Sequence, residues 1–177
     1  MSKITRRGAL LGGTALALGT SALPRISVGQ TPSGNPIKIG YSMAQTGGLG
    51  PNGQSALLAQ KIWEEQTNKD GGLLGRQVKI VFYDDQSNPS TVPGIYTKLL
   101  DVDKVDLIVG PYATAMIAPA MPVVIQKGKV FIGLFGLAVN SEFNYPKYFA
   151  MILAGPNAKS AFTEGFFQAA AAQNSKL

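Results

Sequence analysis

Few residues in this chain are of a type that does chemistry. Its 177 residues include no histidine and no cysteine, which excludes a Ser-His-Asp triad, a thiol nucleophile, a zinc finger and thiol redox chemistry. A metal site would need oxygen ligands only. Asp84 and Asp85 look paired for acid–base work, but adjacent residues at a strand end point to opposite faces and do not converge on one substrate atom. We therefore expect no catalytic residue, no cofactor and no metal ion.

A glycine-bearing segment is the second candidate for chemistry. Gly48 to Gly53 matches G-x-G-x-x-G between a strand-like and a helix-like run, and Asp84 follows the next strand, where dinucleotide-binding proteins place a ribose-binding acid. However, Gly48 does not come directly off the strand, and Pro51 lacks an amide that could face a pyrophosphate. We favour a loop that brings the backbone close to another small ligand. An exported oxidoreductase with a nucleotide cofactor stays open as the alternative.

The elements that must position these residues alternate between strand and helix. Helical patterns cover residues 52–68, 91–102, 114–127 and 157–172, and strand-like runs cover residues 37–43, 78–83, 105–109, 129–132 and 148–152. Such alternation predicts βαβ units, and right-handed crossovers place helices on both faces of the sheet. The expected fold is therefore α/β, a doubly wound parallel sheet. Its ligands would bind beyond the carboxyl ends of the strands, at residues 44–52, 84–88, 110–114 and 133–137.

Apolar spacing predicts which face of the first helix is buried. Leu58 and Ile62, and likewise Ala59 and Trp63, are four residues apart. This is the spacing of an amphipathic helix, so the stripe is expected to face the sheet.

The N-terminus has the layout of an export signal. Residues 1–22 begin with a basic head containing Arg6-Arg7, continue with a mildly apolar stretch and end in small residues, which resembles a twin-arginine signal peptide. Residues 23–36 are rich in Pro, Gly, Ser and Thr and are interpreted as a linker. Half of the net charge of +6 lies in the signal, and no cluster of Lys or Arg stands out in the remainder. We therefore expect no nucleic-acid partner and no stable membrane insertion.

Four stretches carry a resemblance to a known family. They are IGYSMAQTGG at 39–48, GGLLGR at 71–76, YDDQSNP at 83–89 and MIAPAMP at 116–122. In order and spacing they are similar to the amino-terminal lobe of periplasmic substrate-binding proteins of the branched-chain amino acid type. The resemblance covers residues 37–177. It implies a bilobed clamp that captures amino acids or related small amphipathic carboxylates and delivers them to the permease subunits of an ABC importer in the bacterial periplasm.

The resemblance also implies a division of the chain and a set of ligand contacts. Residues 37–156 correspond to the amino-terminal lobe, and residues 157–177 to the hinge crossing and first helix of a second lobe that is missing here. An apolar surface on that helix, comprising Ala161, Phe162, Phe166, Phe167 and residues 169–172, would then lack its cover. A single-lobe protein that folds this helix back onto its own sheet is the alternative.

The expected contacts come from three loops. Thr114 would offer its hydroxyl and amide to a carboxylate, with Tyr112 and Ala113 beside it; alternatively, Thr114 only caps its helix. Phe135 would supply a backbone carbonyl, and Leu137, which stands where the family often has a hydroxyl residue, would supply an amide. Asn52 would lie near the body of the ligand or cap the first helix. A ligand-sensing lobe of a receptor system is a further functional alternative.

Overall fold

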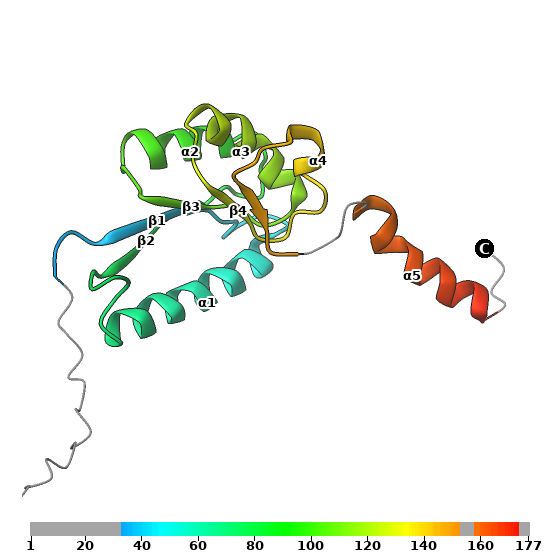
Figure 1. The fold of residues 1–177 in the computed structure, drawn as a ribbon, viewed down its shortest axis with the longest axis horizontal. Coiled ribbons are helices and arrows are strands. Elements are labelled where there is room, and N and C mark those ends of the chain that lie inside the picture. The colour runs from blue at the N-terminus through cyan, green and yellow to red at the C-terminus, as the bar shows by residue number, and fades with distance from the viewer. Residues whose placement is uncertain (1–32, 153–157, 174–177) are drawn as a thin grey trace, which may run out of the picture.

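The computed structural model describes residues 33–152 and 158–173. Its strands form one parallel sheet in the order β2-β1-β3-β4-β5. The elements along the chain are β1 (Ile37–Ser42), α1 (Gly50–Lys69), β2 (Val78–Tyr83), α2 (Val92–Asp101), β3 (Leu107–Val109), α3 (Thr114–Gln126), β4 (Phe131–Gly133), α4 (Asn140–Phe143), β5 (Tyr148–Ala150) and α5 (Ala158–Ala172). Helix α1 covers one face of the sheet, and α2 and α3 cover the other (Figure 1). The predicted doubly wound α/β fold is confirmed.

The boundaries differ from the prediction mainly at the short central strands. The apolar run at 105–109 is a strand only over Leu107–Val109, because Val105 is buried in the turn after α2 and its amide bonds to the carbonyl of Leu99 at 3.1 Å. Strand β4 ends at Gly133, one residue beyond the predicted run. The sequence analysis missed α4, which spans only four residues. A helix this short carries no full period of apolar spacing.

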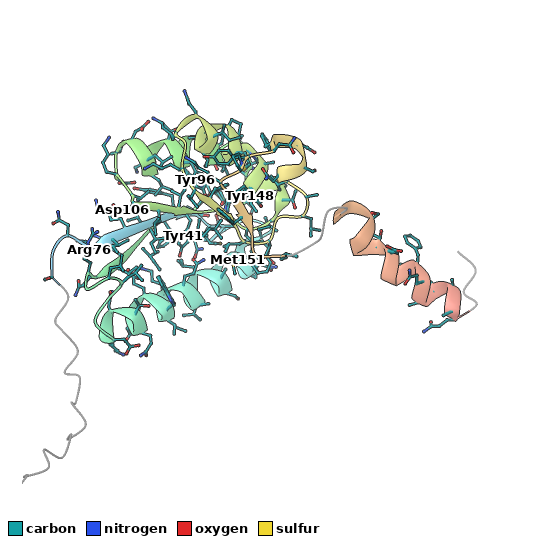
Figure 2. All side chains as sticks on the ribbon, in the orientation of Figure 1. Tyr41, Arg76, Tyr96, Asp106, Tyr148 and Met151 are labelled. Atoms are coloured by element: carbon teal, nitrogen blue, oxygen red, sulfur yellow. The ribbon has the colours of Figure 1, made fainter. Side chains whose placement is uncertain are left out.

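The core between the sheet and α2 and α3 is the larger of two apolar clusters. Tyr96 of α2 and Phe131 of β4 are fully buried there, and their rings meet edge to face at 5.5 Å. The hydroxyl of Tyr96 donates to the carbonyl of Val109 at 2.5 Å, so this buried polar group is satisfied. Tyr41 of β1 lies on the other face, between the sheet and α1 (Figure 2).

The predicted buried face of α1 is wrong. Leu58, Ile62 and Trp63 are 62%, 59% and 45% exposed. Helix α1 instead turns the face that carries Leu57 and Glu64 toward the sheet.

Hydrogen bonds at the edge of the sheet explain this rotation. The Asn68 side chain exchanges two bonds with the backbone of Val78, at 2.7 and 2.9 Å, and Glu64 accepts the Ile80 amide at 2.7 Å. Unpaired amides on an edge strand are costly when covered. Satisfying them fixes the polar side of α1 against β2 and leaves the apolar stripe outside.

Helix α5 stands apart from the sheet in Figure 1. Phe166 and Phe167 are 67% and 51% exposed, and their rings contact one another at 5.5 Å. The predicted exposed apolar surface is thus confirmed for these two residues, whereas the side chains of Ala161 and Phe162 lie outside the described part of the chain. The predicted signal at 1–22 and most of the predicted linker also lie outside it.

Candidate functional site

The strand order places a topological switch point between β1 and β3. From β1 the chain passes through α1 to β2 on one side, and from β2 it passes through α2 to β3 on the other side of β1. The loops that leave β1 and β3 therefore diverge, and doubly wound sheets bind ligands in the crevice that this leaves. The candidate site lies at the carboxyl ends of the strands, where these two loops and the loop after β4 meet.

Contacts between side chains link three of the expected site residues across these elements. Asn52, in the first turn of α1, donates through Nδ2 to the Tyr112 hydroxyl at 2.9 Å. The Tyr112 ring lies 4.8 Å from the Phe135 ring, centroid to centroid, with a tilt of 43°. Phe135 is 45% exposed, so one part of this aromatic pair faces solvent. Asn52 is not the cap of α1, since the helix begins at Gly50 and Leu49 holds the cap position.

The remaining expected residues meet at the start of α3. The Thr114 hydroxyl accepts the Leu137 amide at 2.8 Å, which ties the loop after β4 to the first residue of the helix. Ala113 is the cap residue, at φ 76°, and it makes no side-chain capping bond. The alternative that Thr114 caps the helix is therefore wrong. Because a hydroxyl that accepts one bond still has its proton to donate, Thr114 can offer an O–H to an anion.

All six expected residues thus lie beyond the carboxyl ends of the strands. Sequence reasoning did not anticipate that Thr114 and Leu137 bond to each other, because the pairing joins two loops that only the β3–β4 register brings together. In this state the Leu137 amide already has a partner. Its expected bond to a carboxylate, like the expected role of the Phe135 carbonyl, stays a prediction.

Asp84 fastens the loop after β1 to the loop after β2. Its carboxylate accepts the amides of Gln45 and Gln86 and the hydroxyl of Thr46, each at 2.8 Å. Desolvation raises the pKa of this carboxyl, but the bonds from Gln45, Gln86 and Thr46 outweigh it and hold the pKa below its usual range. Ser87 adds two further bonds, since its hydroxyl accepts the Leu49 amide at 3.0 Å and donates to the Thr46 carbonyl at 2.7 Å.

Asp85 performs a different task from its neighbour. It is fully buried, and it accepts the Ser42 hydroxyl at 2.5 Å and the Ser87 amide at 3.0 Å. Burial raises its pKa more than these bonds lower it. The two carboxylates serve different partners, as the alternation argument predicts. Sequence reasoning missed that Asp84 and Ser87 position the loop. The available signal was the run Asp84–Ser87, in which each aspartate accepts the amide two residues further on, as in side-chain-stabilised turns.

The glycine loop has few free amides for a phosphate. The Gly50 amide bonds to the Gly47 carbonyl at 3.0 Å, and the Gly53 amide bonds to the Leu49 carbonyl at 2.9 Å inside α1. Pro51 has no N–H. A pyrophosphate cradle needs several outward-pointing amides, so this geometry argues against the nucleotide-binding alternative.

Within the described ranges 33–152 and 158–173, no three acidic side chains gather as metal ligands would. Within the same ranges, none of the helices combines the length and hydropathy needed to cross a bilayer.

The fold and its switch-point site define a class, that of the doubly wound α/β ligand-binding domains. A family model described as periplasmic binding protein matches residues 36–176. The chain belongs to the periplasmic binding protein family.

Comparisons with individual proteins agree with this family. An amino acid binding protein of Pseudomonas aeruginosa is 29% identical over 93 residues, which is 49% of this chain and 25% of that protein. The branched-chain amino acid transporter substrate binding protein LivJ of Streptococcus pneumoniae, solved with isoleucine, has a TM-score of 0.60 at 24% identity over 66% of this chain and 33% of its own. A putative branched-chain amino acid ABC transporter from Silicibacter pomeroyi has a TM-score of 0.65 at 21% identity over 76% of this chain and 34% of its own. This chain therefore spans about a quarter to a third of these proteins.

Proposed function

We propose that this chain is a ligand-binding lobe of the substrate-binding component of an ABC importer. It would capture amino acids or related small amphipathic carboxylates in the periplasm and present them to membrane permease subunits. The observation that carries the proposal is the line of contacts from Asn52 through Tyr112 to Phe135, beside the Thr114–Leu137 bond, at the switch point. Membership of the periplasmic binding protein family and the similarity to an amino acid binding protein support it.

The chemistry of the site suits a small carboxylate with an apolar body. Thr114 offers a hydroxyl at the start of α3, where the helix dipole favours negative charge. Phe135, which is 45% exposed on the loop bonded to Thr114, offers apolar surface.

The affinity of this chain alone should be low. A clamp gains affinity by closing on its ligand from two sides and expelling water. At the candidate site the described residues would contact a ligand from a single lobe, so we expect a dissociation constant in the range of about 1 mM or weaker.

The experiment is a titration of the isotope-labelled chain with L-leucine, followed by NMR. We expect the amide signals of residues 112–115 and 135–137 to shift with millimolar leucine. Thr114→Val should remove these shifts, because the valine side chain has the same shape but no hydroxyl. Thr97→Val is the matched control, since Thr97 is exposed on α2 and bonds only to the Pro93 carbonyl of its own helix.

Two results would contradict the proposal. Shifts confined to residues outside these loops would move the site elsewhere, and a micromolar dissociation constant would refute capture by one side of a clamp. The role in import is tested separately by gene neighbourhood. A permease gene beside this one supports an importer component, whereas a receptor gene in that place favours the sensing lobe.

A further inference from the structure

The aromatic pair at the candidate site, Tyr112 and Phe135, is partly exposed although its packing does not require exposure. Tyr112 packs partly on the smaller core cluster, whereas Phe135 is 45% exposed at the carboxyl end of β4. An exposed phenylalanine loses the benefit of burial. Its ring nevertheless rests against the Tyr112 ring at 4.8 Å, so it presents a defined aromatic surface to solvent.

The polar end of Tyr112 is fixed in turn. Its hydroxyl accepts the Asn52 side chain at 2.9 Å from α1, which limits rotation of the ring between two elements. A ring held in this way is a stacking surface that pays little conformational entropy when a ligand arrives.

The position of Thr114 next to this aromatic surface limits the size of the ligand. Thr114 directly follows the Tyr112-Ala113 pair, and its hydroxyl contacts Leu137, two residues beyond Phe135. A ligand that touches both groups needs its carboxylate close to its ring. Leu137 brings its backbone amide to this place and has no side-chain hydrogen-bonding group.

We propose that the ligands of this lobe are aromatic carboxylates, bound with the ring against Phe135 and Tyr112 and the carboxylate at Thr114. This inference rests on the proposed function and narrows its substrate class from amino acids and related carboxylates in general to carboxylates with a flat, unsaturated ring. Offset-stacked and edge-to-face pairs bind better than their area alone predicts, so the preference is for aromatic over saturated rings of equal size.

The test compares benzoate, cyclohexanecarboxylate and L-leucine as ligands of the full 177-residue chain, by NMR titration. Benzoate and cyclohexanecarboxylate have the same carbon skeleton and charge and differ in the ring. We expect benzoate to bind about two- to tenfold more tightly than cyclohexanecarboxylate. Its ring protons should shift upfield because they lie over the Phe135 ring.

Two variants identify the ring responsible. Phe135→Leu keeps an apolar side chain. In this variant benzoate and cyclohexanecarboxylate should bind with about the same affinity. Phe166→Leu is the matched control, because Phe166 is also an exposed member of an aromatic pair, on α5, and this variant should keep the preference. The dispersion of the amide spectrum shows whether each variant is folded, and Tyr112→Leu provides a second test if Phe135→Leu is not.

The outcomes separate this inference from the function on which it rests. Equal affinity for the two ring acids, or a preference that survives in Phe135→Leu, overturns the aromatic assignment. Leucine binding at residues 112–137 as tightly as benzoate also overturns it but leaves the proposed function standing. If none of the three compounds shifts these residues, both the inference and the proposed function fail.

Discussion

Replacing Gly53 by alanine tests how α1 is seated at the candidate site. Gly53 lies in the first turn of α1, buried against the end of β1. A Cβ at this position would overlap the Ala44 carbonyl oxygen and lie 2.7 Å from its carbon. Both are backbone atoms, so no side-chain rotation relieves the clash, and α1 must move away from the sheet.

The magnitude follows from two opposing effects. Overpacking a close contact costs about 1–3 kcal/mol, and removing a glycine from a helix gains about 0.5–1 kcal/mol. The clash with backbone puts Gly53→Ala at the upper end, so we expect a net loss of about 2 kcal/mol. For a protein of this size that lowers the melting temperature by roughly 4–8 °C.

Gly94→Ala is the matched control for this substitution. Gly94 also lies in the first turn of a helix, α2, but its added Cβ would meet nothing within 4 Å. Only the propensity gain remains, so this variant should be more stable by about 0.5–1 kcal/mol.

The assay is urea unfolding followed by circular dichroism at constant protein concentration, which reports both free energies of unfolding on one scale. A Gly53→Ala protein as stable as the Gly94→Ala protein would refute the close seating of α1 on β1. Since Asn52 precedes Gly53, the same variant should also weaken the Asn52–Tyr112 bond, which the NMR signals near Tyr112 would report.

Four further predictions each concern one residue or one pair of neighbouring residues. Leu57→Ala should destabilise the protein by about 1–3 kcal/mol, and Leu58→Ala by less than about 0.5 kcal/mol in the same urea assay, because only Leu57 packs on the core. The lowered pKa of Asp84 means that the wild type loses stability as pH falls through and below about 4, and Asp84→Asn should flatten that loss in unfolding curves measured between about pH 3 and pH 7. The raised pKa of Asp85 has the opposite sign, so Asp85→Asn should be more stable than the wild type at pH 7 and lose this advantage as the pH falls and Asp85 becomes protonated; an advantage independent of pH would contradict this reasoning. Tyr112→Phe removes only the bond to α1 and should cost at most about 1 kcal/mol of stability, and a larger loss would mean that the hydroxyl has a second buried partner.

Local pattern predicted much of the fold because each element satisfies a rule within a few residues. The run Val78–Tyr83 is a strand as predicted, and the helix at 114–127 begins at Thr114 despite two internal prolines. The order of strands and helices along the chain then fixed a doubly wound sheet through the handedness of crossovers. That topology also predicted which loops would meet.

Sequence reasoning failed where a long-range contact outweighed a local preference. The spacing of Leu58 and Ile62 predicted their burial, yet both face solvent, because Glu64 and Asn68 satisfy the backbone of β2. No apolar period reports such an edge contact.

At the candidate site the sequence determined which residue types lie at the carboxyl ends of the strands, and the absence of histidine and cysteine limited what they can do. Only the tertiary structure decided their partners. Asn52 reaches Tyr112, Tyr112 meets Phe135, and Thr114 takes the Leu137 amide, each across an element boundary. The physical reason is that hydrogen bonds and ring contacts depend on distances of a few ångströms between loops, and these distances are set by the register of the sheet and the packing of α1 and α3 upon it.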